Sequence, residues 1–328
     1  MPATPPSAIV CVSLNSALDH TFEVRRLRLG QHAHGRLLST QPAGKAVNVA
    51  RILQTLGRPC TLTGLVGEAE RADFERSFDP ALVRVRLLGL PAPTRQNVTL
   101  IDAEEGIETH IRDLGPEIPA AALDSLAGEL CGLAAPGVWM IFAGSLPRGI
   151  SPELFQELLA AVTRRGARVA LDSSGPALDV IRRQSVWLIK PNREELAALA
   201  GQGTADAASL VRAARSLSAR AEVVLASAGA EGCFLIKGNV ALHAWLDVPV
   251  RDMAASGHGA RPIISTVGAG DALLAGYVAA LARGLTGENA LRQAVAAAAS
   301  ACLQTRAGEI DAAQLAAFAP CVRVESCG

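Results

Sequence analysis

The sequence predicts an α/β protein with a doubly wound, mostly parallel sheet that is flanked by helices. Three observations lead to this fold class. From about residue 120, short apolar runs alternate with helical patterns, as in successive βαβ units. The tight turn Gly268–Gly270 precedes a long apolar run at 272–282, which predicts a buried helix. Two groups of alternating, polar-rich strands, at about 20–41 and 94–113, predict a second, smaller sheet that is exposed on one face.

The individual elements follow from periodicity and from turn residues. Residues 8–14, rich in Ile and Val, predict the first buried strand. After the polar segment 42–44, apolar residues at helical spacing predict a helix that ends at Gly57, and a hairpin is expected around 103–106. The remaining elements are predicted as strands at 61–66, 138–142, 168–171, 187–189 and 222–226, an antiparallel pair at 233–236 and 240–250, and helices at 67–78, 120–134, 151–165, 192–201, 205–219, 269–284, 287–304 and 311–317.

Polar loops at the strand ends indicate where a ligand binds. In doubly wound sheets, ligands lie beyond the carboxyl ends of the strands. We expect the small sheet to cover a cleft at this edge, and the chain length suits one large domain or two modest ones. The polar loops that would border the cleft are 15–19, 144–147, 172–175, 190–192, 227–229 and 268–271.

Charge and composition argue against several classes of protein. The chain has 328 residues, with 31 Lys and Arg against 31 Asp and Glu, so its formal charge is zero. Neither this balance nor an aromatic content of 3% suits a protein that binds nucleic acid or an anionic membrane. The apolar runs are too short to span a bilayer, and no signal peptide is recognisable. Seven scattered cysteines without a CxxC motif predict reduced thiols, so we expect a cytoplasmic protein.

The turn before the long apolar run is the leading candidate for an anion site. The backbone N–H groups of Gly268, Ala269 and Gly270 would converge at the positive end of a helix dipole. An acid at the next position, Asp271, would repel an anion. It makes sense if it takes the proton from a hydroxyl that attacks a phosphoryl group held by the turn. The alternative interpretation is that Asp271 only caps the helix.

Two basic residues and one helix start are further candidates. Lys45, at the beginning of a helix, and Arg95, at the start of a polar strand, are suited to binding phosphate, although both are also ordinary surface residues. Asn192 and Glu195 have nearly the spacing of a capping box, which is the interpretation that local sequence favours. The alternative is that these two side chains orient water around Mg²⁺ near phosphates.

Other kinds of chemistry find little support in the sequence. The pair Gly44-Lys45 lacks the first Gly and the Ser or Thr of a P-loop, and no G-x-G-x-x-G opens a βαβ unit. His32 and His34 alone do not make a metal site, and no set of nucleophile, His and Asp stands out. Asp19, beyond the first strand, is suited either to accepting hydrogen bonds from sugar hydroxyls or to forming a turn.

Taken in order, these segments resemble the motifs of the ribokinase-like (PfkB) carbohydrate kinases over about residues 8–318. Within that family they are most similar to the phosphosugar branch, which holds 1-phosphofructokinase, tagatose-6-phosphate kinase and the minor 6-phosphofructokinase. The segments that carry the resemblance are Leu14-Asn-Ser-Ala-Leu-Asp19, Pro42-Ala-Gly-Lys-Ala-Val-Asn-Val-Ala50, Thr94-Arg-Gln-Asn-Val98, Gly144-Ser-Leu-Pro-Arg-Gly149, Leu171-Asp-Ser-Ser-Gly175, Lys190-Pro-Asn-Arg-Glu-Glu-Leu196, Ser227-Ala-Gly-Ala-Glu-Gly232 and Ser265 to Gly276.

The resemblance implies a ribokinase-like fold and transfer of the γ-phosphate of ATP, with Mg²⁺, to a hydroxyl of a ketohexose monophosphate. It implies that Asp271 is the base and that the amides of Gly268, Ala269 and Gly270 hold the transferring phosphoryl group. The sugar phosphate would then contact Asp19, Gly44, Lys45, Asn48 and Arg95. The ATP would contact Lys190, Asn192, Glu195, Ser227, Gly229 and Gly232, with Asn192 and Glu195 reaching the metal through water. The resemblance also implies a single domain over residues 8–318, in which the small sheet is a lid, and a homodimer formed through that lid.

The sequence departs from the family pattern at three places. Ala43 and Ala46 stand where the family usually has Gly, Ser16 replaces a Pro, and the loop 251–264 is longer than usual. These departures keep open a catalytically weak regulatory protein that binds a sugar phosphate. A kinase for an unphosphorylated sugar or a nucleoside is a further alternative. Lys45 and Arg95 argue against it, because both are suited to a substrate that already carries a phosphate.

Overall fold

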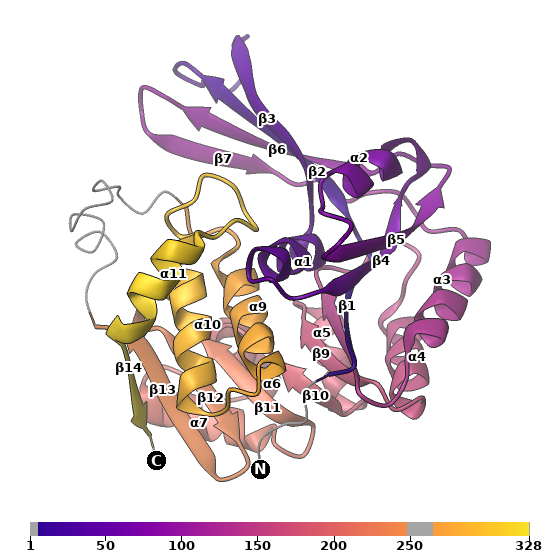
Figure 1. Ribbon diagram of the computed structural model, residues 1–328. Coiled ribbons are helices and arrows are strands. Elements are labelled where there is room, and N and C mark those ends of the chain that lie inside the picture. Colours follow the sequence, from indigo (N-terminus) through magenta and orange to yellow (C-terminus); the bar gives the residue numbers. More distant parts are fainter. Residues whose placement is uncertain (1–5, 248–264, 328) are drawn as a thin grey trace.

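The computed structural model describes residues 6–247 and 265–327, in which a large twisted sheet carries helices and a small sheet projects beyond it (Figure 1). The predicted loop 251–264 lies outside the described residues. The strands of the large sheet are β1 (Ala8–Ser13), β4 (Cys60–Gly67), β5 (Val83–Leu90), β8 (Val138–Ala143), β9 (Arg168–Asp172), β10 (Val186–Ile189), β11 (Ala221–Ser227), β12 (Cys233–Lys237), β13 (Val240–Leu246) and β14 (Val322–Ser326).

The large sheet has the strand order β14-β13-β12-β11-β10-β9-β8-β1-β4-β5. Neighbours from β11 through to β5 pair in parallel, whereas β11, β12, β13 and β14 pair antiparallel. The predicted fold class is therefore confirmed. Strands β5 and β14 were not predicted, because both lie at sheet edges, where polar residues such as Arg84 and Arg323 interrupt the apolar pattern.

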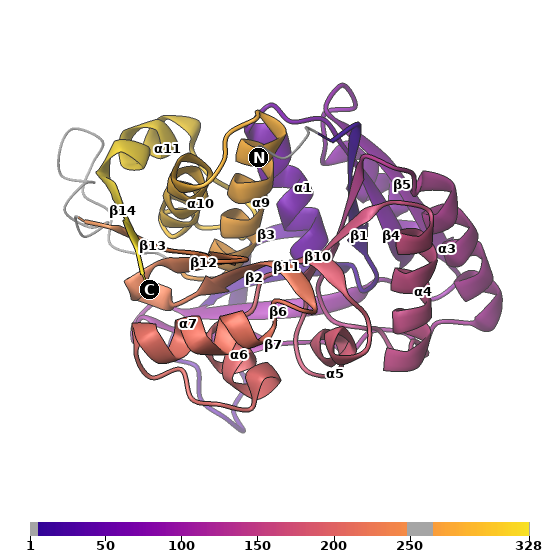
Figure 2. The ribbon, with the colours of Figure 1, turned by 90° about the horizontal axis from the view of Figure 1, so that it is seen from below.

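Helices cover both faces of this sheet (Figure 2). One face carries α1 (Lys45–Thr55), α2 (Arg71–Arg76), α9 (Ala269–Ala282), α10 (Glu288–Ala301) and α11 (Ala312–Phe318), and the other carries α3 (Ala120–Leu133), α4 (Pro152–Arg164), α5 (Pro176–Asp179), α6 (Arg193–Ala200) and α7 (Ala207–Ser216). Side chains alternate along the strands and so supply two cores. In β1, Ile9 and Cys11 join one buried cluster and Val10 and Val12 the other.

The small sheet has the strand order β3-β2-β6-β7, formed by β2 (Ala17–Val24), β3 (Gly35–Ala43), β6 (Arg95–Asp102) and β7 (Ile107–Ile111). Its central strands β2 and β6 are parallel and its outer pairs are antiparallel. The segment 15–19 was predicted as a loop, but β2 begins at Ala17. Asp19 therefore lies on a strand, opposite Asn97 and Gln41, which fixes its direction better than a loop would.

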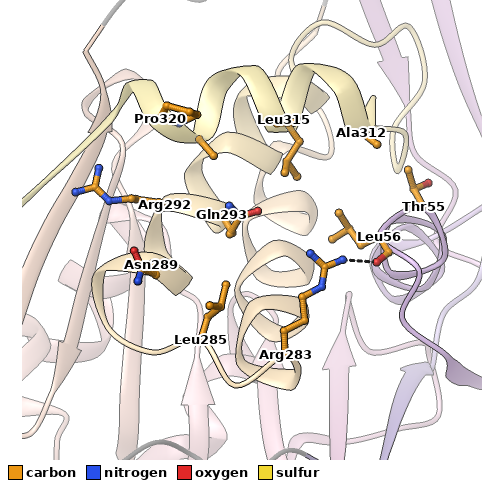
Figure 3. Close-up of a pocket in the computed structure, with 12 residues that line it drawn as sticks. Thr55, Leu56, Arg283, Leu285, Asn289, Arg292, Gln293, Ala312, Leu315 and Pro320 are labelled. Carbon is orange, nitrogen blue, oxygen red and sulfur yellow. Dashed lines mark hydrogen bonds between the residues drawn. The ribbon is translucent and has the colours of Figure 1, made fainter.

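A cavity of about 650 Å³ opens between α10, α11 and the ends of α1 and α9 (Figure 3). Leu285 and Leu315 form part of its wall, and beside them Nη2 of Arg283 donates to the backbone oxygen of Leu56 at 2.6 Å. The cavity lies at the carboxyl ends of α1 and α9, and none of the predicted site residues lines it. Across the described residues, no helix has the length and apolar character needed to cross a bilayer.

Candidate active site

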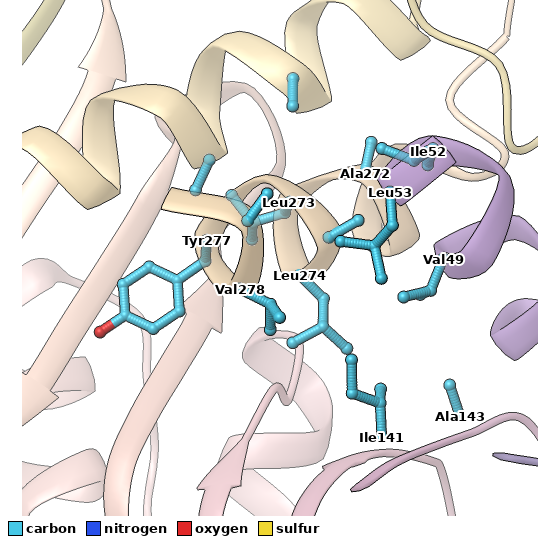
Figure 4. Close-up of a cluster of buried hydrophobic side chains, with 14 of the residues drawn as sticks. Val49, Ile52, Leu53, Ile141, Ala143, Ala272, Leu273, Leu274, Tyr277 and Val278 are labelled. Carbon is cyan, nitrogen blue, oxygen red and sulfur yellow. The ribbon is translucent and has the colours of Figure 1, made fainter. Parts of the chain in front are cut away.

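The site is built at the amino ends of two helices that pack side by side. Helix α9 is buried continuously from Asp271 to Leu281, as its apolar sequence predicts. Figure 4 shows Leu274 of α9 pointing toward Ile141 of β8, with Leu53 of α1 beside it, and all three are at most 1% exposed. Because this core holds α1 and α9 together, their first turns lie next to each other.

Those first turns are joined by a buried hydrogen bond between two predicted site residues. Asn48 Nδ2 of α1 donates to Oδ2 of Asp271 in α9 at 2.8 Å, and the two residues are 6% and 5% exposed. Burial and, after it, the nearby carboxylate of Asp172 raise the pKa of Asp271 to about 6, although Lys45, the Asn48 hydrogen bond and Lys190 oppose the shift. A carboxylate with this pKa is poised to accept a proton near neutral pH.

The turn before α9 offers backbone N–H groups beside this carboxylate. Gly268 caps the helix at φ +86°, and a side chain there would meet residues 307 and 308 at 3.2 Å. Ala269 donates its N–H to the oxygen of Thr266 at 3.3 Å, whereas the N–H groups of Gly268 and Gly270 have no acceptor among the described residues. A side chain at Gly270 would come within 3.1 Å of Nζ of Lys190, so an ammonium group lies close to the turn.

Asp172, at the end of β9, connects two lysines to this site. It is 1% exposed, and its Oδ1 lies 3.1 Å from Nζ of Lys45 and 3.3 Å from Nζ of Lys190. Burial alone would lower the pKa of Lys45, but Asp172 and Asp271 outweigh burial, and the pKa is raised. The side-chain nitrogens of both lysines thus meet at one carboxylate close to the turn, which suits a site for an anion.

Asp172 lies in one of the segments that carry the family resemblance, but the sequence did not predict a role for this residue. A polar loop just past a buried strand was a signal for the site as a whole. The contact with Lys45, which is 127 residues away in the sequence, gave no local signal.

The predicted sugar-binding residues fall into two groups. Gly44, the cap of α1 at φ +127°, Lys45 and Asn48 lie with Asp271 and the lysine pair. Asp19 and Arg95 lie at the root of the small sheet, where Asn97 Nδ2 donates to Oδ1 of Asp19 at 2.7 Å and Arg95 Nε donates to the oxygen of residue 15 at 3.0 Å. Arg95 and Lys45 thus have different partners, the backbone oxygen of residue 15 for Arg95 and the carboxylate of Asp172 for Lys45.

The predicted nucleotide residues come together from two loops. The backbone N–H of Ser227 donates to the oxygen of Pro191 at 3.0 Å, which brings Ser227 beside Asn192. Asn192 and Glu195 do form the capping box of α6, with both reciprocal hydrogen bonds at 2.8 Å. Glu195 also lies near enough to Lys45 to affect its pKa. The capping role leaves one Glu195 oxygen without a hydrogen-bond partner among the described residues, within electrostatic reach of Lys45.

Two glycines that follow Ser227 have different surroundings. Gly229 has φ +59° and open space around its Cα. Gly232 has φ +88°, and a side chain there would lie 2.1 Å from the backbone oxygen of Ala244 in β13. The structure thus gives Gly232 a packing role, whatever its part in nucleotide binding.

Free carboxylate oxygens near the lysines suit a metal ion held mainly by phosphates. Within the described ranges, no three His, Cys, Asp or Glu side chains gather as a metal site. Oδ2 of Asp172 is buried without a partner, and one oxygen of Glu195 is unused. Mg²⁺ commonly takes one or two carboxylates from the protein and its other ligands from substrate phosphates and water. Asp172 and Glu195 fit this kind of site.

Comparison with known proteins gives this site a family. Residues 9–313 match the family described as pfkB family carbohydrate kinase. The chain belongs to this family. It is therefore a phosphotransferase with an alcohol group as acceptor, and the predicted family and enzyme class are confirmed.

Relatives of this pfkB kinase are named 1-phosphofructokinase. It is 38% identical to the protein of Rhodobacter capsulatus over 279 residues, which cover 84% of each chain. It is 32% identical to that of Haemophilus influenzae over 306 residues, or 93% of this chain and 94% of the relative. Among solved structures, phosphofructokinase-2 of Escherichia coli, in complex with potassium, has a TM-score of 0.84 at 23% identity and covers 96% of this chain and 98% of its own. At that identity the likeness shows the fold alone.

Proposed function

We propose that this pfkB kinase transfers the γ-phosphoryl group of MgATP to a hydroxyl of a ketohexose monophosphate, with fructose 1-phosphate as the first candidate. The observation that carries the proposal is the buried carboxylate of Asp271, placed beside the free amides of the turn before α9 and two charged lysines. Relatives named 1-phosphofructokinase, at 38% and 32% identity, support the phosphosugar branch.

In the proposed reaction, Asp271 accepts the proton of the attacking sugar hydroxyl. At the same time the oxygen of that hydroxyl forms a bond to the γ-phosphorus. The bond from phosphorus to the leaving oxygen breaks on the opposite side, and ADP departs with the electron pair. The amides of Gly268 and Gly270 and the ammonium groups of Lys45 and Lys190 stabilise the charge on the transferring group. Asn48 keeps the carboxylate oriented through its hydrogen bond.

The nucleotide and metal are assigned to the loops around α6. Asn192 and Glu195, through water, together with the free oxygen of Asp172, would hold Mg²⁺, and Ser227 and Gly229 would lie along the nucleotide. When bound, Mg²⁺ neutralises phosphate charge during transfer.

The departures from the family pattern do not favour the regulatory alternative. Ala43 and Ala46 are 1% and 0% exposed, so their methyl groups are buried and do not fill an open cleft. Ser16, which replaces a Pro, is 4% exposed and donates from Oγ to Oγ of Ser13 at 2.8 Å, so its hydroxyl is already bonded within the protein.

The small sheet is proposed as a lid that also forms a homodimer. Its cross-strand pairs place Phe22, Leu37, Leu100, Val98 and Ile111 on one face. The opposite face bears Asp19 and Asn97. An exposed apolar face on a thin sheet needs a cover, and a second copy of the same sheet supplies one by symmetry. All seven cysteines are unpaired, which fits the proposed cytoplasmic location.

The test is a coupled assay of ADP formation with fructose 1-phosphate, fructose 6-phosphate, tagatose 6-phosphate and their unphosphorylated parent sugars. We expect turnover of a ketohexose phosphate, and a loss of roughly 10²–10⁴-fold in kcat in Asp271→Asn with substrate binding retained. Normal turnover by this variant contradicts the assignment of the base. Tight binding of a sugar phosphate without ADP release across the panel favours the regulatory alternative.

A further inference from the structure

Two buried polar atoms on neighbouring turns of α1 have no hydrogen-bond partner among the described residues. One is Oδ1 of Asn48, whose Nδ2 donates to the carboxylate of Asp271, and the other is Nη1 of Arg51. The two residues are three positions apart, so their side chains lie on the same face of the helix. One atom is an acceptor and the other is a charged donor, and neither the sequence nor the proposed reaction gives Arg51 a role.

The guanidinium group of Arg51 is held in place on its other sides. Its Nη2 donates to the backbone oxygen of Pro42 at 2.8 Å, and its Cζ lies 5.6 Å from the centroid of the Phe78 ring. Arginine keeps its charge in a folded protein, and a buried charged donor that is left unpaired is strongly unfavourable. We therefore expect Nη1 to have a partner.

The charged neighbours of Arg51 are engaged elsewhere. Burial lowers the pKa of this arginine; Glu309 and Asp19 oppose the shift, and Arg306 adds to it. Glu309 lies 3.7 Å from Nη1 of Arg306, and Oδ1 of Asp19 accepts a hydrogen bond from Asn97 at 2.7 Å. Neither of these carboxylates reaches hydrogen-bond distance of Nη1 of Arg51.

Gly308, in the loop between α10 and α11, shows that the two unpaired atoms face the same place. A Cβ on this glycine would lie 2.7 Å from Oδ1 of Asn48 and 3.0 Å from Nη1 of Arg51. Both atoms therefore lie about one hydrogen-bond length from a common point, although no direct hydrogen bond joins them. A water molecule suits such a pair, since its oxygen accepts from the guanidinium group and one O–H donates to the amide oxygen.

The orientation of the Asn48 amide decides what the carboxylate of Asp271 meets. With Oδ1 on the side of Arg51, Nδ2 faces the carboxylate and donates to it at 2.8 Å. In the reverse orientation Oδ1 would face the carboxylate, and two acceptors would repel each other. A charged donor that reaches Oδ1 through water favours the first orientation over the second.

We propose that Arg51 is a positioning residue for the base. Through one buried water, its Nη1 holds Oδ1 of Asn48 and so keeps Nδ2 on the carboxylate of Asp271. This inference rests on the proposed function, in which Asp271 is the base, and it extends the machinery of the site by one turn along α1.

The test is a double-mutant cycle on kcat with the best substrate of the sugar panel. Arg51→Met keeps an unbranched apolar side chain but removes the donor, and kcat should fall roughly 10-fold while KM for ATP stays unchanged. In the Asn48→Ala background the same substitution should change kcat little, because the amide that Arg51 orients is gone. Arg51→Lys keeps a charged donor and should recover part of the loss. The matched control, Arg164→Met on the exposed last turn of α4, should leave kcat unchanged in both backgrounds.

Two kinetic results overturn the inference. The first is an unchanged kcat in Arg51→Met. The second is a set of additive effects of Arg51→Met and Asn48→Ala on kcat, since additivity indicates a structural role that is independent of the amide. If Arg51→Met does not fold, Arg51→Lys replaces it in the cycle.

A crystal structure of the wild type separates the inference from the proposed function. We expect an ordered water at hydrogen-bond distance from both Nη1 of Arg51 and Oδ1 of Asn48. If that water is present and no sugar of the panel is turned over, the proposed function fails and the positioning of Asn48 stands. If no water lies between the two atoms, the inference fails whatever the activity.

Discussion

Replacing Asp271 by Asn should make the protein more stable while it removes turnover. Burial and the neighbouring Asp172 raise the pKa of Asp271 from 3.8 to about 6 in the folded protein. In the unfolded chain the carboxyl group returns to its ordinary pKa. The folded state therefore holds a proton more tightly than the unfolded state does, and stability falls as the pH rises through the window between these two values.

The size of the effect follows from the shift. About two pKa units correspond to about 3 kcal/mol, which the wild type loses in full above pH 6. Asparagine is neutral at every pH and can still accept the hydrogen bond from Asn48. We expect Asp271→Asn to be more stable by about 3 kcal/mol at pH 8. At pH 5 the gain should be about half as large, because the folded carboxyl group is by then mostly protonated.

The measurement is urea unfolding of both proteins at pH 8 and pH 5, analysed by linear extrapolation. Asp124→Asn, on the exposed surface of α3, is the control and should change stability by less than about 0.5 kcal/mol at either pH. Equal or lower stability of Asp271→Asn at pH 8 refutes the reasoning. A gain of the same size at both pH values refutes it too, since it would not come from a buried charge.

Three further predictions concern the base, one glycine and the lid. The kcat/KM should fall below about pH 6, where Asp271 becomes protonated. This acid limb should move to higher pH in Asn48→Ala and to lower pH in Asp172→Asn, because Asn48 lowers the pKa of Asp271 and Asp172 raises it. Movement of the limb in the same direction in both variants contradicts these opposing influences. Gly232→Ala should lower the free energy of unfolding in urea by at least about 2 kcal/mol, because its φ is +88° and its Cβ would meet a backbone oxygen at 2.1 Å. The control, Gly203→Ala, has open space at its Cβ and should lower the free energy of unfolding by less than about 1 kcal/mol. Leu100→Asp, on the apolar face of the small sheet, should turn a dimer into a monomer in light scattering, and a monomeric wild type rules out the lid contact.

Local patterns were sufficient for most elements and for the turn at the base. The alternation of apolar runs with helical patterns predicted β8, β9, β10 and β11 and the helices around them, because buried parallel strands and amphipathic helices are encoded by neighbouring residues. The Gly-Ala-Gly turn before an acid marked the start of α9 for the same reason. Edge strands β5 and β14 carry polar residues on exposed positions and gave too weak a pattern to be recognised.

The sequence by itself determined the fold class and the family and supplied the candidate residues of the site, since each depends on local pattern or on motif order. Tertiary structure alone decided how those residues are combined. It joined Asn48 to Asp271, which are 223 residues apart, and brought Lys45 and Lys190 to the same oxygen of Asp172. Contacts of this kind depend on which strand ends meet at one sheet edge, and no local pattern of residues carries that information.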